Sequence, residues 1–156
     1  MPSYIYENVD VNGLRSIVTS TLTTLNNETP KIVEMHSTIT LENWKGSASD
    51  AFKGKVNVIL TRINDTKDRL TNVNSMLDLI ENYQTLCKQL REKEREKAIR
   101  ENETQGLDAI TDRIALEGLF GLIGGLNREI SGLNSQILSL ENQINGMWGE
   151  KWIIII

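Results

Sequence analysis

The chain has 156 residues and a formal net charge of −4, with one cysteine, one histidine and two prolines. The length fits a single domain, the lone cysteine excludes an internal disulfide, and one cysteine with one histidine leaves too few ligands for a zinc site. Charges of both signs are interspersed, so no nucleic-acid partner is expected, and abundant Leu, Ile, Asn and Glu with few aromatic residues favour long helices.

The amino terminus, MPSYIYENVD, has neither the basic nor the apolar segment of a cleaved secretory signal. No run in the chain approaches the ~18 apolar residues of a membrane span. We therefore expect that, if the protein leaves its cell, it does so by a route that needs no cleaved signal.

The first predicted helix covers residues 10–42 and carries an apolar stripe at helical spacing: Leu14, Val18, Leu22, Leu25, Ile32, Met35 and Ile39. Pro30 lies inside it, and Thr29 can cap a restarted helix, so we predict a kink or short break near Asn27 to Thr29 and not the end of the element. His36 lies close to the stripe. Because no second ligand or nucleophile motif accompanies it, we expect a satisfied or half-exposed histidine and not a metal ligand or general base.

Trp44-Lys45-Gly46 follows and predicts the elbow of a helical hairpin. Gly46 can take a positive φ, and the indole of Trp44 is large enough to plug the open end of the hairpin. Ser47 is the predicted N-cap of the next helix, and Asp50 completes an acidic variant of the capping box. Trp44 and Gly46 can also belong to a recognition surface, and the two interpretations are compatible.

The second predicted helix starts near Ala48 and carries a stripe with coiled-coil spacing, here called the middle seam: Phe52, Val56, Ile59, Ile63, Leu70, Val73, Leu77 and Ile80. Cys87 is expected to be a small core residue, with an intermolecular disulfide as the alternative. Residues 91–105 are highly charged but nearly neutral in sum, which indicates a solvated helix end. Their predicted helical ion pairs are Glu92 with Arg95, Glu94 with Lys97, and Glu96 with Arg100.

The third predicted helix has the longest stripe, the C-terminal seam: Leu116, Leu119, Ile123, Leu126, Ile130, Leu133, Ile137, Leu140, Ile144 and Met147. Glycines at 118, 121, 124 and 125 lie inside it, each unfavourable by up to ~1 kcal/mol in a helix. The chain can therefore turn at these glycines or near residue 104. The second alternative sets apolar residues against apolar residues, with Leu116 near Glu92 and Met147 near Thr61. We prefer it, with Gly106 as the residue of special φ and the later glycines as close-packing or bending points.

These patterns predict an all-α fold, a long antiparallel helical hairpin or bundle with coiled-coil packing. We expect one structural domain overall, made of a hairpin over 1–90, a charged helix end and turn over 91–106, a third coiled-coil helix over 107–148 and an apolar tail over 149–156. The tail contains Trp152 and four isoleucines, and Trp148 immediately precedes it. It can be an interfacial anchor, a contact for a partner or an artificial addition.

With the Trp44-Lys45-Gly46 elbow, Ala48, Ala51 and Phe52 after it, and a long apolar stripe on each side, residues 8–90 resemble the WXG-type, early-secreted-antigen-like family. The resemblance implies a helical hairpin that forms side-by-side dimers and serves as a substrate or partner of type VII secretion in Gram-positive bacteria and mycobacteria. It implies export without a cleaved signal peptide, from the bacterial cytoplasm.

Two features depart from the family pattern. The charged run and the C-terminal seam make the chain longer than usual members. Many members also carry a tyrosine with an acidic residue four places later, after the second helix, whereas Tyr83 is followed at that spacing by Cys87, and Tyr6 with Asp10 lies at the opposite end. The resemblance is therefore better matched to the helical partners encoded beside LXG-type toxins, which bind the targeting domain of the toxin.

The sequence thus predicts a non-enzymatic interaction protein with no cofactor and no metal site. Its partners are expected to be a helical protein, such as an LXG-type toxin or a WXG-type protein, or a second copy, together with the secretion machinery. The predicted interaction seam comprises Ile59, Ile63, Leu70, Val73, Leu77, Ile80, Leu126, Ile130, Leu133, Ile137, Leu140 and Ile144. The alternative is a membrane-active, pore-forming helical toxin that uses the apolar, glycine-rich segment 118–126. At nine residues this segment is too short to span a bilayer, which disfavours the alternative.

Overall fold

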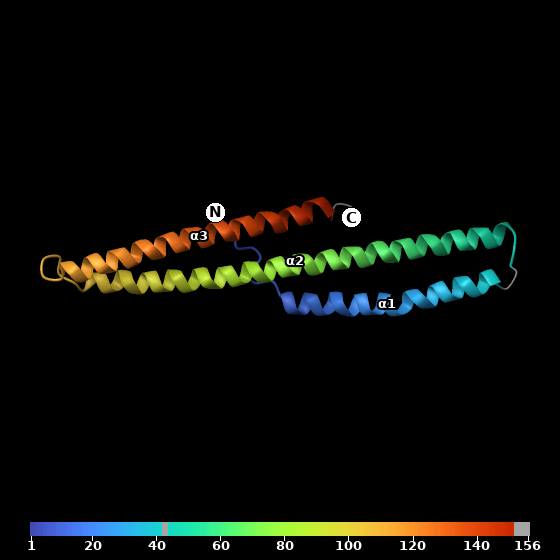
Figure 1. Cartoon of the computed structure of the whole chain (residues 1–156), viewed down its shortest axis with the longest axis horizontal. Helices are drawn as coiled ribbons and strands as arrows, with labels where there is room; N and C mark the ends of the chain where they lie inside the picture. Colours follow the sequence, from blue (N-terminus) through green and yellow to red (C-terminus); the bar gives the residue numbers. More distant parts are fainter. Residues whose placement is uncertain (42–43, 152–156) are drawn as a thin grey trace. The chain divides into compact units, whose positions relative to one another are not determined.

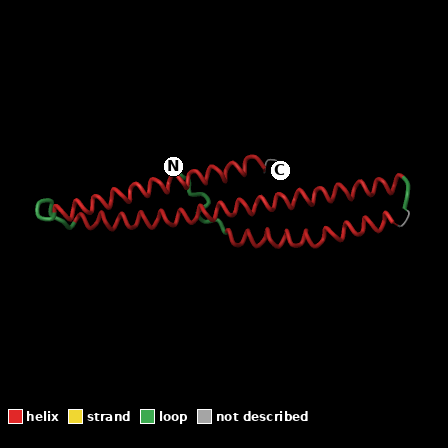
Figure 2. Tube along the Cα trace, in the orientation of Figure 1, coloured by secondary structure: helices red, strands yellow, loops and turns green. Residues whose placement is uncertain are grey.

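Three long helices make up the computed structural model, which describes residues 1–41 and 44–151, with side chains for 1–38 and 44–148. They are α1 (Val11–Leu41), α2 (Ser47–Gln105) and α3 (Arg113–Lys151) (Figure 1). Neighbouring helices pack antiparallel, α1 on α2 and α2 on α3, and the described residues contain no strand (Figure 2). The all-α fold predicted from the apolar periodicity is confirmed.

Helix α1 begins at an aspartate cap and continues through its proline. The Asp10 carboxylate accepts a hydrogen bond from the Gly13 N–H at 2.9 Å, and the Asp10 carbonyl accepts one from Leu14 N–H at 3.1 Å. Of the predicted kink or short break before Pro30, the break is wrong, since the helix is unbroken from Val11 to Leu41, and the kink stays a prediction. Thr29 is not a cap: its hydroxyl donates to the Leu25 carbonyl at 2.6 Å, as a threonine does inside a helix.

Helix α2 begins immediately after Gly46, which has the predicted positive φ, at 107°. The Asp50 N–H donates to the Gly46 carbonyl at 3.1 Å, so Gly46 is the capping residue. The prediction of Ser47 as the cap is wrong by one residue. A glycine cap costs only a few tenths of a kcal/mol relative to serine, and here the backbone needs a positive φ that serine would adopt only with strain.

The second turn covers residues 106–112 and is held by two aspartates. The Asp108 carboxylate accepts bonds from the N–H groups of Ile110 and Thr111, and the Asp112 carboxylate accepts one from the Asp108 N–H. Gly106 does not have a positive φ, so the prediction of Gly106 as the special residue is wrong. The reversal nevertheless lies next to the predicted position near 104, and the glycines at 118–125 lie inside α3.

This longer turn changes the register between α2 and α3. The Tyr83 hydroxyl meets Glu141, and the Lys93 amine meets Glu129. In an antiparallel pair the two residue numbers at facing positions have a nearly constant sum, which defines the register. This sum is 222 to 224 in the structure, whereas the predicted pairing of Leu116 with Glu92 and Met147 with Thr61 requires 208. The predicted register is wrong, because the turn was predicted near residue 104, whereas the loop between the helices covers residues 106–112.

Ion pairs in the charged end of α2 also differ from the predicted ones. They join a basic residue to an acid three or four places later: Arg91 to Glu94, Lys93 to Glu96, Lys97 to Glu101 and Arg100 to Glu103. The three predicted pairs do not occur among the ion pairs of the described residues. All are at the surface, where such a pair contributes ~0.2–0.5 kcal/mol, so the difference has little energetic consequence.

The chain forms two compact units that share α2. The hairpin unit is residues 10–77, in which α1 packs on the first part of α2. The terminal unit combines residues 1–9 with the described residues from Asp78 onward, in which α3 packs on the second part of α2. The domain boundaries predicted from the sequence stay predictions. The predicted tail begins inside α3, and residues 152–156 lie outside the described part of the chain.

Candidate interaction surfaces

The elbow of the hairpin unit presents its tryptophan to solvent. The Trp44 side chain is 41% exposed and packs on Phe52, with ring centroids 5.5 Å apart and planes inclined by 52°. Ser49 is the buried residue of the elbow, and its hydroxyl donates to the Trp44 carbonyl at 2.8 Å. The prediction of a buried indole plug is wrong: a serine hydroxyl ties the elbow together, and the indole lies over Phe52 at the surface.

Most of the middle seam in the hairpin unit is only partly covered. Leu77 is buried and Ile63, Leu70 and Val73 are half-buried, whereas Ile59 is 49% exposed. Further large apolar side chains of this unit are exposed: Leu14, Ile17, Val33, Met35, Trp44 and Val58. Two helices bury only the strip between them, so the flanks of each apolar stripe stay in water.

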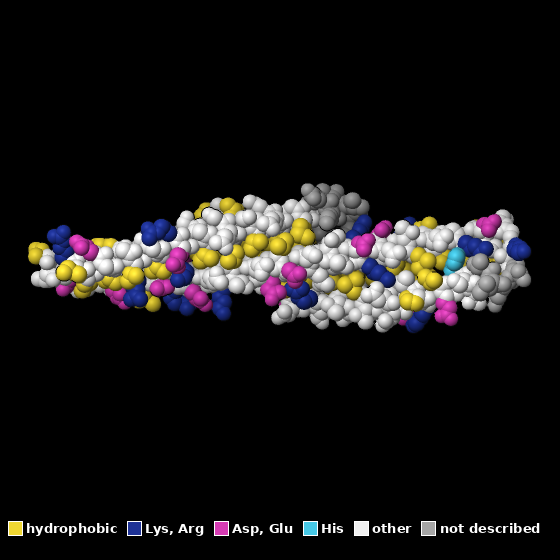
Figure 3. All heavy atoms as spheres, viewed as in Figure 1, with side chains coloured by type: hydrophobic (Ala, Val, Ile, Leu, Met, Phe, Trp, Pro, Cys, Tyr) yellow, Lys and Arg dark blue, Asp and Glu magenta, His cyan; other side chains and the backbone are white. Residues whose placement is uncertain are grey.

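The terminal unit has a more complete core. Ile80 on α2 and Leu126, Ile137 and Ile144 on α3 are buried, and Ile130, Leu133 and Leu140 are half-buried. Tyr83, Cys87 and Leu90 continue the core along α2. On the face drawn in Figure 3, apolar side chains form a band along the α2–α3 pair. The predicted seam residues of α3 thus lie in or beside the core of this pair, but Ile80 is the one predicted seam residue of α2 in the terminal unit, since the other five lie in the hairpin unit. The role of the seam in binding a partner stays a prediction.

The glycines of α3 do not pack closely against another helix. A Cβ added at Gly118, Gly121, Gly124 or Gly125 would meet nothing within 4 Å. Their predicted role as close-packing points within the chain is therefore wrong. Phe120 and Leu122, between them, are exposed.

Residues 1–9, here called the N-terminal segment, dock on the α2–α3 pair through a buried carboxylate that sequence analysis missed. Glu141 is only 6% exposed. It accepts hydrogen bonds from the Ser3 N–H at 3.0 Å, the Ser3 hydroxyl at 2.5 Å and the Tyr83 hydroxyl at 2.7 Å. A buried charge is tolerated only when it is hydrogen-bonded in this way. Glu141 therefore joins the N-terminal segment to both helices.

The rest of the N-terminal segment is held by polar and aromatic contacts along the same pair. The Gln84 amide donates to the carbonyls of Tyr6 and Val9, at 3.1 and 2.8 Å. The Tyr4 hydroxyl donates to the Asn134 side-chain oxygen at 2.6 Å, and the Tyr6 ring meets the Tyr83 ring edge-on at 5.6 Å.

Arg91 supplies a further contact, because its guanidinium lies 4.9 Å from the centre of the Tyr4 ring and pairs with Glu7 at 3.3 Å. The N-terminal segment is thus bound through its backbone, its aromatic rings and its acidic side chain.

Burial and hydrogen bonding shift the pKa values of this cluster in opposite directions. Burial alone would raise the pKa of Glu141, but bonds from Ser3 and Tyr83 stabilise the carboxylate and lower that pKa below its ordinary value. Burial, together with the bond to Glu141, raises the pKa of Tyr83. Burial and the charge of Glu7 raise the pKa of Cys87 to about 11. The thiol is therefore protonated and, at 1% exposure, shielded, so it is not a reactive site.

One sequence signal could have revealed this cluster. Glu141 lies four residues after Ile137 and three before Ile144, so an acid occupies a row of buried apolar positions. Tyr83 stands in the equivalent row of α2, three residues after Ile80. Two hydrogen-bonding side chains in facing apolar rows indicate a buried pair. The N-terminal segment itself has no periodicity by which its position could be predicted.

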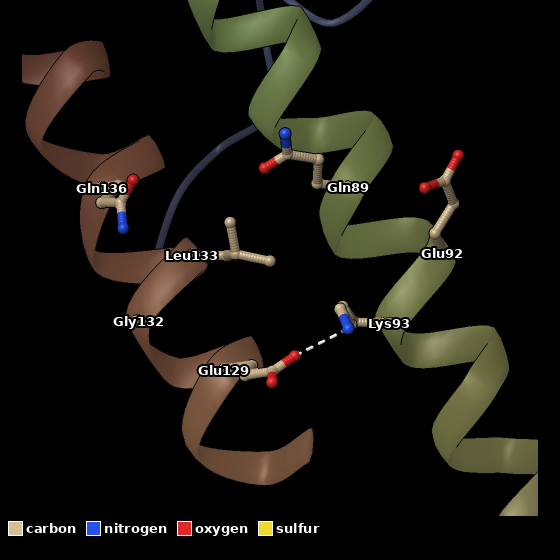
Figure 4. A pocket seen from close by; sticks show the side chains of 7 residues that line it. All are labelled: Gln89, Glu92, Lys93, Glu129, Gly132, Leu133 and Gln136. Atoms are coloured by element: carbon tan, nitrogen blue, oxygen red, sulfur yellow. Dashed lines mark ion pairs between the residues drawn. The ribbon is translucent and has the colours of Figure 1, made fainter. Parts of the chain in front are cut away.

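A groove of about 390 Å³ lies between α2 and α3 of the terminal unit, lined by Gln89, Glu92, Lys93, Glu129, Gly132, Leu133 and Gln136 (Figure 4). Leu133 points into the space between the helices, and the ion pair of Lys93 with Glu129, at 2.8 Å, crosses one end. This part of the C-terminal seam is therefore accessible from outside, where Gly132 leaves room.

Within the described part of the chain, no three His, Cys, Asp or Glu side chains are grouped so as to hold a metal ion, and no helix is long and apolar enough to cross a membrane. Compared with known proteins, the chain matches no family model, no curated sequence and no solved structure. The surfaces described above are therefore the basis for any functional conclusion.

Proposed function

We propose that this chain is a substrate or partner of a type VII secretion system that binds another helical protein, or a second copy of itself, through the incompletely covered apolar faces of its hairpin unit. The observation that carries the proposal is the exposure of large apolar side chains on both helices of that unit, with Ile59 of the predicted seam 49% exposed. A partner helix that covers such a face gains ~25 cal/mol per Å² of apolar area removed from water.

The elbow supports the same proposal. Trp44 and Gly46 stand between two long helices, as they do in the WXG-type hairpins that the sequence resembles, and the indole is open to solvent instead of filling a core. A partly exposed tryptophan next to a backbone of fixed conformation is a favourable recognition element, because Trp is enriched among the residues that dominate binding energy.

Association through the hairpin unit is tested with one charged substitution and a matched control. Ile59→Asp should weaken self-association or partner binding at least ~10-fold, since it puts an unpaired charge into an apolar contact. Asn57→Asp, two residues earlier on the same helix and also exposed, adds the same charge outside the seam and should change little. Sedimentation equilibrium measures both. Equal association of the two variants would contradict the proposed seam.

Export is tested separately, by expressing the chain in a Gram-positive bacterium with an active type VII system and measuring it in the medium. Export should require the secretion ATPase and should fall for Trp44→Ala and Gly46→Ala. Lys45→Ala should be exported like the unchanged chain. If export were independent of the ATPase, the secretion role would be refuted, whatever the association experiments show.

A further inference from the structure

The conformation of the N-terminal segment is held mainly by its contacts with α2 and α3, and only to a small extent by hydrogen bonds within the segment. Its own backbone hydrogen bonds are two, from Glu7 N–H to the Tyr4 carbonyl at 3.2 Å and from Val9 N–H to the Tyr6 carbonyl at 3.4 Å. Tyr4 has φ 57°, a conformation that a bulky residue keeps only when its surroundings impose it. The α2–α3 face therefore acts as a receptor for this segment.

The receptor recognises the segment at three separate points. At one end Glu141 accepts the N–H and hydroxyl of Ser3, and at the other Gln84 donates to two backbone carbonyls. Between them, Arg91 covers the Tyr4 ring and pairs with Glu7. None of these contacts requires that segment and receptor belong to one chain.

The segment can also leave without unwinding the helix that follows it. The cap of α1 is Asp10, whose bonds to Gly13 and Leu14 lie wholly within the hairpin unit. The boundary between the two compact units falls between Val9 and Asp10, so the segment packs with one unit and is joined to the first helix of the other. Exchange of such an element between copies is a low-cost route to a dimer, because the same contacts form in either arrangement.

We propose that the α2–α3 face of the terminal unit is a docking site for a short segment that contains turns, occupied here by residues 1–9 of the same chain and, in a pair of copies, by residues 1–9 of the second copy. The protein concentration decides whether the segment docks within its own chain or on a second copy. The chain's own segment is present at a high effective concentration, so the segment of a second copy must compete with it. This inference depends neither on the hairpin seam nor on the secretion role.

Cys87 supplies the readout. Its thiol is 1% exposed, and Cys87 lies four residues after Tyr83 and four before Arg91, which contact the rings of Tyr6 and Tyr4, so it lies on the face of α2 that the segment covers. Release of the segment should open the thiol to an alkylating reagent. The rate is followed by intact mass, so that two copies of different mass are measured in one tube.

The experiment mixes two defective copies of the full chain. The segment-defective copy, Tyr4→Ala with Tyr6→Ala, keeps its receptor, and the face-defective copy, Gln84→Ala with Asn134→Ala, keeps its segment. Each alone should be alkylated on the order of 10-fold faster than the unchanged chain, as for a locally opened region. Ile5→Ala is the matched control, because Ile5 lies in the same segment but is 59% exposed, and it should react like the unchanged chain.

An excess of the face-defective copy should then slow alkylation of the segment-defective copy, increasingly with concentration, because its intact segment occupies the vacant receptor. No protection at any concentration overturns exchange. An unchanged rate for the segment-defective copy alone overturns the docking role of the segment. If that copy loses helicity by circular dichroism, Tyr4→Phe with Tyr6→Phe, which removes only the two hydroxyl bonds, replaces it.

A second measurement uses a fluorescent peptide with the sequence of residues 1–10. Fluorescence anisotropy should show it binding the segment-defective copy at least ~10-fold more tightly than the unchanged chain, whose own segment competes at high effective concentration. The face-defective copy should not bind it. Equal binding to all three would show that the peptide adheres elsewhere and would overturn the proposed site.

Discussion

Removal of the Tyr83 hydroxyl tests the buried carboxylate cluster most directly. Tyr83 is fully buried, and its hydroxyl donates to Glu141 at 2.7 Å. Tyr83→Phe keeps the ring and removes this bond, while the N–H and hydroxyl of Ser3 still donate to the carboxylate. A hydrogen bond to a charged group contributes ~1.5–3 kcal/mol, so we expect a loss of that size in the free energy of unfolding at pH 7.

Urea unfolding followed by circular dichroism measures the loss, and Tyr6→Phe is the matched control. The Tyr6 hydroxyl bonds the Asn145 side chain at the surface, between neutral groups, so its removal should cost less than ~1 kcal/mol. A loss below ~0.5 kcal/mol for Tyr83→Phe, or equal losses for the two variants, would refute the argument that a buried charge makes this bond strong.

The same pair of variants predicts a pH dependence. The pKa of Glu141 is lowered in the folded protein, so its ionised form contributes stability that is present above the ordinary glutamate pKa. That stability is lost as pH falls through the lowered folded pKa. Tyr83→Phe removes one cause of the lowering, so its cost should shrink in this acid range. A cost that stays constant wherever both proteins are folded would contradict the assignment to Glu141.

Three further predictions concern the elbow and the glycine-rich part of α3. Trp44→Ala should cost ~1–2 kcal/mol in urea unfolding, less than the ~3–5 kcal/mol of a buried aromatic, since the indole loses mainly its contact with Phe52; a cost above ~3 kcal/mol would show that the indole is buried. Gly121→Ala should stabilise the protein by up to ~1 kcal/mol, because the added Cβ meets nothing within 4 Å, and thermal unfolding would reveal the opposite sign if another helix packs there. The unchanged chain should release no dye from liposomes; leakage that Phe120→Asp abolishes while association in solution persists would favour the membrane-active alternative.

The helices were predictable from the sequence because their apolar residues recur three or four positions apart over many turns. The proline and the glycines inside these segments do not end the helices. The ends of helices were less predictable. At the start of α2 the cap is decided by the positive φ of Gly46, and the neighbouring Ser47 was an equally plausible candidate from the sequence. The register error has the same origin, since the aspartates 108 and 112 build a longer turn than a glycine signal implied.

The functional surfaces were harder to predict than the helices. An apolar stripe shows which side of a helix avoids water but not how much of that side its neighbours cover, so Ile59 and Leu77 look equivalent in sequence and differ greatly in exposure. The N-terminal segment was missed because its contacts are individual hydrogen bonds and ring contacts, with no repeat. Only the pairing of Glu141 with Tyr83 has a signal in the sequence, because both residues occupy positions in rows of otherwise apolar, buried residues.

The contrast between the two units identifies the place at which we expect a partner. Both are built on the same helix α2 and the same kind of stripe, yet in the terminal unit the N-terminal segment adds a third layer, and Tyr83, Cys87 and Leu90 are excluded from water. The hairpin unit has no third layer among the described residues, and its stripe stays half-covered. A layer of apolar side chains across α1 and α2 would complete the hairpin unit as residues 1–9 complete the other, and the exposed Ile59 and Trp44 are the side chains that such a layer would bury first.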